Sequence, residues 1–187
     1  MNVEPLGLRE VLLIKPRAYR DDRGHFLETW REAGYAEHGI GPFVQDNVSV
    51  SRRGVLRGLH FQHPHDQAKL VCTLQGRIFD VAVDVRVGSP TFGKWVSAEL
   101  SDENSWQLYI PAGFAHGFVA LSDDVVFTYK CSDYYAPDAE RTIRWDDPAL
   151  GITWPASSPI ITAKDASAPL LADLGPDFLP KYQKPRG

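Results

Sequence analysis

Short runs of apolar or alternating residues, each ended by a glycine, proline or aspartate turn, recur along this chain. Such runs predict β-strands. The predicted strands are Leu8–Ile14, Lys69–Leu74, Arg77–Arg86, Trp95–Leu100, Gln107–Ile110, Phe114–Leu121 and Val125–Tyr129. Short strands separated by tight turns are typical of a β-sandwich or barrel. One helix is predicted, at Trp30–His38, where Glu32 and Glu37 can face solvent.

The strand predicted at Arg77–Arg86 has one fully apolar face and one mixed face, because side chains alternate along a strand. The apolar face holds Phe79, Val81, Val83 and Val85, and the mixed face holds Ile78, Asp80, Ala82 and Asp84. A closed barrel holds one small ligand at its mouth. Inward-facing polar residues are therefore of interest, and alternation nominates Asp80, Asp84, Gln107 and Lys130. Alternation does not say which face of each strand is the interior, so exposure to solvent stays open for all four.

The length of 187 residues suits one domain with a sizeable core. We therefore expect a single domain over residues 1–187. Its barrel is expected at about residues 40–135, followed by an irregular C-terminal wrap at about 150–187 that is rich in proline, alanine and aspartate. Hydrophobic residues make up 43% of the chain, which excludes a disordered protein.

The charge and the apolar segments exclude several classes of partner. A formal net charge of −4 and the lack of a basic run argue against binding to nucleic acid. No apolar window has the length of a membrane span, and Val11–Ile14 is too short for a signal peptide. Cys72 and Cys131 lie within strand-like runs and are most simply reduced core thiols. These features predict a cytoplasmic protein with no nucleic-acid or membrane partner.

Candidate chemistry is concentrated in the segment Gly54–Gln62, which carries Arg57 and His60, with Lys69 following. Histidine is the side chain best suited to moving protons near neutral pH, and arginine is best suited to binding phosphate. A cation beside a base is what enolate chemistry on a charged sugar requires. Taken on their own, Arg57 and His60 are more simply explained as a surface turn and a structural histidine, so the functional interpretation depends on the rest of the chain.

The histidines also raise the question of a metal site. His63-Pro64-His65 and Pro111–His116 resemble the two motifs of the cupin barrels, in which a His-x-His pair and a following glutamate join a later histidine around iron, manganese or zinc. The glutamate is missing here, and Lys69 stands near its expected place, where it would repel a dication. The sequence therefore favours a cupin-like barrel without a metal over a metal-dependent cupin enzyme.

Motifs over most of the chain occur in a specific order. They are Asp22–Glu28, Gln45–Ser49, Gly54–Gln62, Phe79–Asp84, Gly88–Trp95, Ile110–Phe118, Tyr129–Pro137 and Ile143–Pro148. In these segments the chain resembles the dTDP-4-dehydrorhamnose 3,5-epimerase family. The resemblance implies an all-β fold, a cupin-like antiparallel barrel or jelly roll with a few short peripheral helices. It also implies an isomerase that inverts C3 and C5 of dTDP-4-dehydro-6-deoxy-D-glucose to give dTDP-4-dehydro-L-rhamnose, in dTDP-rhamnose biosynthesis.

The same resemblance implies the catalytic residues. His60 is the base, and Asp165 orients its imidazole. Lys69 stabilises the enolate oxygen, and Tyr129 is the acid on the opposite face of the sugar. The C4 carbonyl of the substrate already acidifies the protons on C3 and C5, so neither a metal nor another cofactor is expected.

Residues for the nucleotide follow from the resemblance as well. Arg23 and Arg57 would neutralise the diphosphate through charge-assisted hydrogen bonds. Gln45 and Asn47 would bind phosphate or sugar hydroxyls, and Tyr135 would stack on the base. Further binding positions are His116, Glu140 and Lys164.

The family also implies a homodimer. Phe26 and Glu28 would contact the thymine of the neighbouring subunit, so that the segment Arg23–Glu28 completes the partner's nucleotide site. The strand-like segment Leu8–Ile14 is a candidate for pairing across the interface.

Two departures and two alternatives remain. The loop Gln62–Gln67 has extra histidines and is shorter than in the family, and Ala163 stands where some members carry an acidic residue. Relatives that invert only C3 or only C5 share the barrel and the His–Tyr pair, so a mono-epimerase of a related dTDP-4-keto-6-deoxysugar stays open. A sugar-nucleotide-binding module without double epimerisation is the other alternative, although the presence of all four catalytic candidates argues against it.

Overall fold

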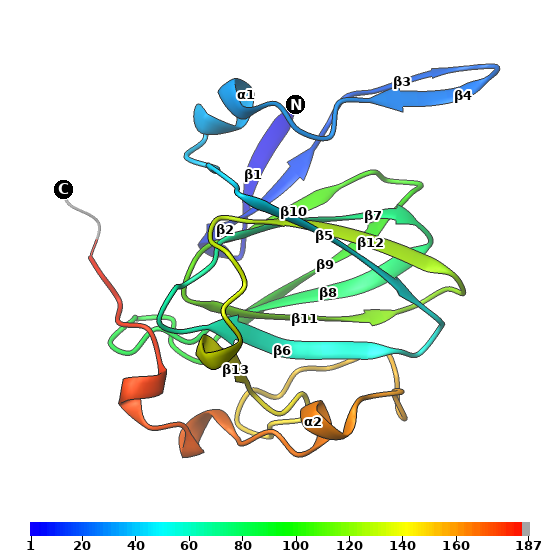
Figure 1. Ribbon diagram of the computed structural model, residues 1–187. Helices are drawn as coiled ribbons and strands as arrows, with labels where there is room; N and C mark the ends of the chain where they lie inside the picture. Colours follow the sequence, from blue (N-terminus) through cyan, green and yellow to red (C-terminus); the bar gives the residue numbers. More distant parts are fainter. Residues whose placement is uncertain (185–187) are drawn as a thin grey trace.

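The protein consists mainly of two antiparallel sheets that face each other, as seen in a computed structural model that describes residues 1–184 (Figure 1). The strands are β1 Asn2–Leu6, β2 Leu8–Lys15, β3 Ala18–Asp21, β4 Gly24–Leu27, β5 Gln45–Ser51, β6 Leu56–Gln62, β7 Lys69–Gln75, β8 Arg77–Asp84, β9 Trp95–Ser101, β10 Gln107–Ile110, β11 Phe114–Ala120, β12 Val125–Cys131 and β13 Glu140–Thr142. The short helices are α1 Glu32–Ala36, η1 Pro137–Ala139, α2 Ala163–Ala166, η2 Leu171–Asp173 and η3 Pro176–Phe178. The predicted all-β fold with a few short peripheral helices is confirmed.

The order of strands in each sheet determines which side chains face the space between them. One sheet has the order β1-β2-β10-β7-β12-β5, and the other has the order β13-β6-β11-β8-β9. Strands β3 and β4 form a separate hairpin. Each predicted strand is present, and the largest differences are at β8, which ends at Asp84, and at β12, which continues to Cys131. Strand β12 is longer than predicted because it pairs along its length with both β5 and β7.

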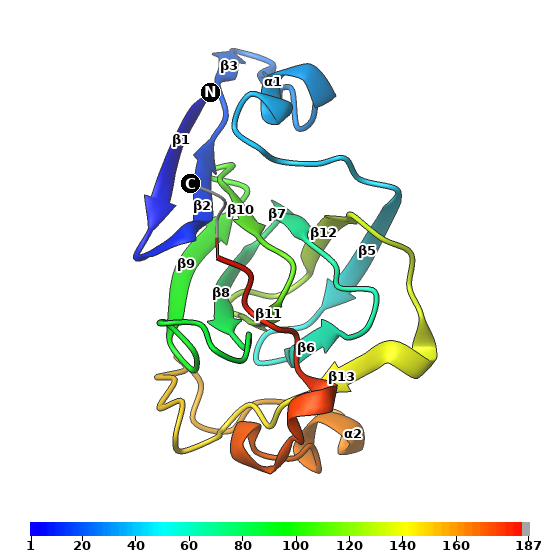
Figure 2. The ribbon, with the colours of Figure 1, turned by 90° about the vertical axis from the view of Figure 1, so that its left-hand side faces the viewer.

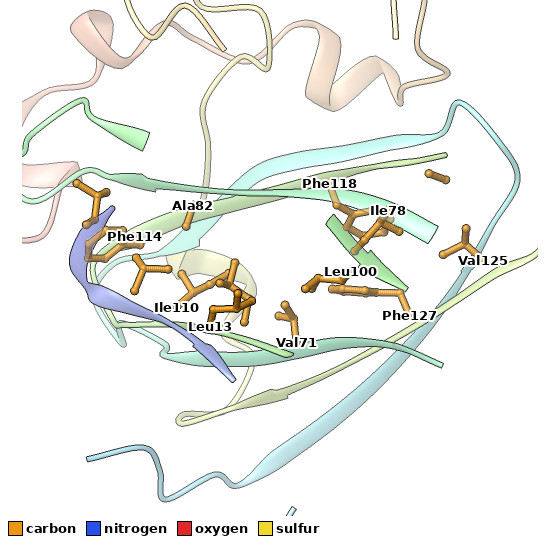
Figure 3. Packing of buried hydrophobic residues seen from close by; sticks show 14 residues of the cluster. Leu13, Val71, Ile78, Ala82, Leu100, Ile110, Phe114, Phe118, Val125 and Phe127 are labelled. Atoms are coloured by element: carbon orange, nitrogen blue, oxygen red, sulfur yellow. The ribbon is translucent and has the colours of Figure 1, made fainter. Parts of the chain in front are cut away.

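The space between the sheets is filled by a cluster of apolar residues that includes Val71, Ile78, Leu100 and Phe127 (Figure 3). The mixed face of β8 points into this space. Its fully apolar face points outward, where Val81, Val83 and Val85 pack under the C-terminal part of the chain. Asp80 shares the inward face with Ile78, so one polar side chain of β8 is placed in the interior.

The C-terminal part of the chain covers the outer face of the second sheet. Leu150, Leu171 and Leu179 are buried there with the outward residues of β6 and β8. Figure 2 shows α2 and the turns that follow it below β6 and β13, on the side of the molecule opposite α1 and β3. This placement brings a segment distant in sequence beside β6.

The N-terminal hairpin β3–β4 extends away from the two sheets (Figure 1). Helix α1 follows it and is shorter than the predicted range Trp30–His38. No side chain caps its first turn at Arg31, and Gly39 follows its end with a left-handed φ of 72°. Glu32 and Glu37 are exposed, as predicted. Within residues 1–184, no helix has both the length and the apolar character needed to cross a bilayer.

Candidate active site

Two adjoining cavities lie between the sheets, with volumes of about 330 Å³ and about 300 Å³. Both are lined by His60, Lys69, Tyr129 and Glu140. His60 comes from β6 in one sheet, whereas Lys69 and Tyr129 come from β7 and β12 in the other. The cavities therefore form one site in which side chains of the two sheets face a common space.

His60 is paired with Asp165 across a long separation in sequence. His60 Nε2 lies 2.8 Å from Asp165 Oδ1. Asp165 belongs to α2, which is held beside β6 because Leu56 N donates to Ile160 O at 2.9 Å. Thr162 Oγ1 caps the helix by accepting from Asp165 N at 3.2 Å. The Asp165 side chain is 4% exposed and that of His60 is 31% exposed, so the imidazole is the more accessible member of the pair.

The surroundings keep Asp165 ionised. Burial acts to raise its pKa, but the hydrogen bond and charge of His60, the backbone N–H of Gly58 and the charge of Lys164 together hold the pKa below its ordinary value. An ionised carboxylate can only accept a hydrogen bond, so His60 Nε2 carries the proton and Nδ1 is left as the basic nitrogen. This arrangement is suited to general-base catalysis.

Lys69 and Tyr129 lie on the same face of the opposite sheet. In the pairing of β12 with β7, Tyr129 is opposite Val71 and Cys131 is opposite Lys69. Burial lowers the pKa of Lys69, although nearby Cys131, Asp80 and Glu140 act to raise it. Burial raises the pKa of Tyr129, so its phenol stays protonated at neutral pH. Among residues 1–184, no group accepts a hydrogen bond from Lys69 Nζ or the Tyr129 hydroxyl, which leaves both donors available to a ligand.

A second histidine–aspartate pair closes the interior side of the site. His116 Nε2 lies 2.9 Å from Asp80 Oδ2, and both side chains are almost completely buried. In the pairing of β11 with β6, His116 lies opposite His60. Burial raises the pKa of Asp80, while His116 and Lys69 act to lower it. Asp80 was one of the four residues nominated by alternation and was not among the predicted site residues.

One side of the cavity mouth is formed by a group of polar residues. Tyr135 Oη donates to Glu140 Oε2 at 3.1 Å, and Lys164 Nζ donates to the same oxygen at 2.5 Å. Gln45 Oε1 accepts from Tyr135 N at 2.9 Å, and Gln45 Nε2 donates to Asn47 Oδ1 at 3.1 Å. Burial acts to raise the pKa of Glu140, but Lys164 and Tyr135 hold it below its ordinary value. Glu140 is therefore ionised and accepts hydrogen bonds from both Tyr135 and Lys164 at the cavity mouth.

Arg57 lies on the other side, at the second cavity. Its Nε donates to Ser51 Oγ at 3.1 Å and one terminal nitrogen donates to Val50 O at 3.3 Å. The guanidinium makes no ion pair with any residue in the described part of the chain. A cation of this kind beside a cavity can bind an anionic group of a ligand.

Three predicted binding residues, Arg23, Phe26 and Glu28, do not line these two cavities. Arg23 bonds to Asp21 within the hairpin, and Glu28 bonds to Arg31 at 3.0 Å. Phe26 is 71% exposed on the same hairpin. All other predicted site residues line one or both cavities.

Sequence reasoning missed several polar residues of the cavities, among them Ser49, Gln62 and Gln67. The first two continue an alternation that starts from predicted site residues. Ser49 follows Asn47 by two positions on β5, and Gln62 follows His60 by two positions on β6. Period-two spacing along a strand was the signal that would have found them.

The His-x-His motif is used for other contacts. His63 Nδ1 lies 2.9 Å from Asp66 Oδ1, and His65 Nδ1 lies 3.5 Å from Asp133 Oδ2. Within the described range 1–184, no three histidine, cysteine or acidic side chains come together in a way that would hold a metal ion.

Comparisons with known proteins agree with these features. A sequence model described as dTDP-4-dehydrorhamnose 3,5-epimerase matches residues 5–173. The epimerase of that name from Neisseria gonorrhoeae is 50% identical over 167 residues, which are 88% of this chain and 51% of that protein, so the chain spans about half the length of this relative.

Solved structures match over nearly the whole chain. A dTDP-6-deoxy-D-glucose-3,5-epimerase from Legionella pneumophila, in complex with dTDP-4-keto-L-rhamnose, matches with a TM-score of 0.95 and 49% identity over 97% of this chain and 98% of that one. A 3′-monoepimerase from Streptomyces bikiniensis, in complex with dTDP-quinovose, matches with a TM-score of 0.84 and 38% identity over 90% of this chain and 87% of that one. The chain belongs to the dTDP-4-dehydrorhamnose 3,5-epimerase family.

Proposed function

We propose that this chain is an isomerase that inverts C3 and C5 of dTDP-4-dehydro-6-deoxy-D-glucose, giving dTDP-4-dehydro-L-rhamnose in dTDP-rhamnose biosynthesis. The observation that carries the proposal is the placement of His60 and Tyr129 on facing sheets around one site, with Lys69 beside Tyr129. Membership of the family supports the substrate class.

Proton removal is assigned to His60. The C4 carbonyl of the sugar acidifies the protons on C3 and C5, so that a base of ordinary strength can remove them. His60 Nδ1 takes the proton, the electron pair of the C–H bond moves into a C=C bond, and the carbonyl π electrons move onto the C4 oxygen. Asp165, bonded to Nε2, holds the imidazole and stabilises its cation. Lys69 stabilises the enolate oxygen through its ammonium charge.

Proton return is assigned to Tyr129. Inversion requires that the new proton arrive on the face opposite to the one from which the first was removed. A sugar lying between the two sheets has His60 on one side and Tyr129 on the other, which supports this division of roles. Because burial raises the pKa of Tyr129, the phenol holds its proton until an enolate, a stronger base, is present. Solvent then returns the two side chains to their starting protonation states.

The nucleotide is assigned to the residues around the cavity mouth. Arg57 binds the diphosphate, Gln45 and Asn47 bind phosphate or sugar hydroxyls, and Tyr135 stacks on the base. His116, Glu140 and Lys164 line the same cavities and supply further polar contacts.

The protein is further proposed to work as a homodimer. Arg23, Phe26 and Glu28 lie on a hairpin that extends away from the sheets, and Phe26 is 71% exposed (Figure 1). Such a hairpin can reach the cavity of a second copy. Phe26 and Glu28 would then contact the thymine of the partner, and Arg23 would add a charge beside the diphosphate.

The product formed from dTDP-4-dehydro-6-deoxy-D-glucose tests the proposed function. Proton–proton couplings in the NMR spectrum report the configuration at C3 and C5 separately. Inversion at both carbons is the expected result. Inversion at one carbon would instead establish a mono-epimerase, the second candidate, which the likeness to the Streptomyces bikiniensis 3′-monoepimerase supports. Unchanged substrate would contradict both.

A further inference from the structure

Tyr135 is placed on the cavity rim by side chains rather than by a strand. It lies between the end of β12 and the start of η1, and its side chain is exposed. Gln67 Nε2 donates to Asp133 O at 2.8 Å, which holds the start of this segment. Gln45 Oε1 accepts from Tyr135 N at 2.9 Å. Two further backbone contacts, one on each side of Tyr135, come from Gln62.

The side-chain amide of Gln62 bonds to the backbone on both sides of Tyr135. Its Nε2 donates to Tyr134 O at 3.1 Å, and its Oε1 accepts from Ala136 N at 2.9 Å. The second N–H donates to His65 O at 2.8 Å, in the loop that follows β6. Both donors of the amide are thus used and its oxygen is occupied, in a side chain that is only 4% exposed.

The two hydrogen bonds that the Gln62 side chain makes on either side of Tyr135 form a clamp on the backbone. Through its position on β6, Gln62 connects this clamp to the rest of the site. It lies two positions after His60 on β6, so the two side chains point from the same face of the strand. In the pairing of β13 with β6, Glu140 lies opposite Gln62, and Glu140 accepts the Tyr135 hydroxyl. Strand β6 therefore sets the position of both the proposed base and the aromatic ring on the rim.

We propose that Gln62 is a positioning residue that fixes Tyr135 for stacking on the base of the nucleotide, an inference that rests on the proposed function. Stacking depends on the orientation of the ring, which the backbone on either side of Tyr135 sets. His60 is held by a separate partner, Asp165 of α2. Loss of the clamp should therefore weaken nucleotide binding much more than it slows chemistry.

The variant Gln62→Met tests this role, because methionine keeps the length and volume of the side chain and removes its three hydrogen bonds. Gln75→Met is the matched control, since Gln75 is exposed at the end of β7 and lines neither cavity. We expect Gln62→Met to raise the Kd for dTDP and the KM for the sugar nucleotide about tenfold, the order of a partly lost stacking contact, with kcat within about threefold of the parent. Gln75→Met should change each of these by less than about twofold. The Ala136 amide should exchange with solvent faster in Gln62→Met only.

A double-mutant cycle with Tyr135→Ala separates positioning from a general structural effect. Tyr135→Ala alone should weaken dTDP binding, and adding Gln62→Met should weaken it little further, because the clamp acts through Tyr135. Additive losses, equal losses in the two glutamine variants, or a Tyr135→Ala variant with unchanged dTDP affinity would each overturn the inference. Product formation by the parent protein reports on the proposed function independently of these results.

Discussion

Burial has different consequences for three ionisable groups of the proposed catalytic set, Asp165, Lys69 and Tyr129. Asp165 is buried, but the proton donors around it keep its pKa low, so the carboxylate can support a cationic His60. Lys69 is completely buried, and the nearby groups that act to raise its pKa do not offset this burial, so its pKa falls, whereas burial raises the pKa of Tyr129. At neutral pH these directions leave a fixed anion paired with the base and a neutral phenol on the opposite sheet.

Tyr129→Phe removes one hydroxyl and keeps the aromatic ring. His60 can still remove a proton in this variant and can return a solvent-derived one to the same face. We expect exchange of the sugar protons with solvent to persist, while net epimerisation falls by about 10²–10⁴-fold, the usual effect of losing a general acid. Comparison of deuterium uptake with product formation checks this. Turnover equal to the parent's would show that another group donates the proton.

Lys69→Met should alter the dependence of stability on pH. Because burial puts the pKa of folded Lys69 below the ordinary value of 10.5, the unfolded chain binds more protons between these two pKa values. The free energy of unfolding of the parent should therefore rise relative to that of Lys69→Met as pH increases through this window. Urea unfolding from pH 7 to 10.5 measures the difference. If the difference in free energy of unfolding between the two proteins stayed constant over this range, the pKa of Lys69 would not be lowered by folding. If the parent lost stability relative to Lys69→Met as pH increased, folding would raise the pKa of Lys69 instead.

At the level of elements, the strands with an apolar face could be predicted, including β7, β11 and β12 of the site, whereas two strands that carry site residues, β5 and β6, could not. Strand β8 was found because one of its faces is entirely apolar, and that face turned out to lie under the C-terminal segment. Strands β5 and β6 present Gln45, Asn47, His60 and Gln62 to the cavity, so the apolar alternation that marks a strand is interrupted by the residues of the site. The motifs identified Gln45, Asn47 and His60 as site residues, but sequence spacing could not bring Asp165 to His60. That contact depends on the backbone pairing of Ile160 with β6.

The C-terminal segment should contribute measurably to stability because it covers the apolar face of β8. Leu171 is buried against this face. We expect Leu171→Ala to reduce the free energy of unfolding by about 2–4 kcal/mol, the usual cost of a cavity of this size. Ile160→Ala is the control, since the Ile160 side chain is 52% exposed and the change should stay within about 0.5 kcal/mol. Equal losses in urea unfolding would show that the segment is not packed as described.

For the whole molecule, the position of the β3–β4 hairpin relative to the two cavities bears on how many copies of the chain form one site. The resemblance to the family assigns Arg23, Phe26 and Glu28 to the nucleotide site of the neighbouring subunit. In a single chain they lie on a projecting hairpin, and Arg23 bonds to Asp21 rather than to any group of the cavity. A site shared between two copies accounts for both observations.

Mixing two inactive variants tests the shared site. Arg23→Ala and His60→Ala subunits are combined under conditions that allow exchange, and hybrid formation is followed by native mass spectrometry. In a hybrid dimer with a shared site, one site contains both substitutions, Arg23→Ala and His60→Ala, and the other contains neither. Activity should therefore return from two nearly inactive parents, with up to one working site per hybrid. Hybrids that form without any return of activity would contradict a shared site.

In the proposed mechanism one base, His60, removes the protons on both C3 and C5 and so forms the enolate at each carbon. Incorporation of deuterium from solvent measures this proton removal most directly. The parent protein and His60→Asn are incubated with dTDP-4-dehydro-6-deoxy-D-glucose in deuterated water, and the NMR spectrum reports each carbon. The account predicts deuterium at C3 and C5 with the parent. His60→Asn should lose labelling at both carbons by about 10²–10⁴-fold while it still binds dTDP. Labelling by His60→Asn at the parent's rate, or no labelling by the parent, would contradict the account.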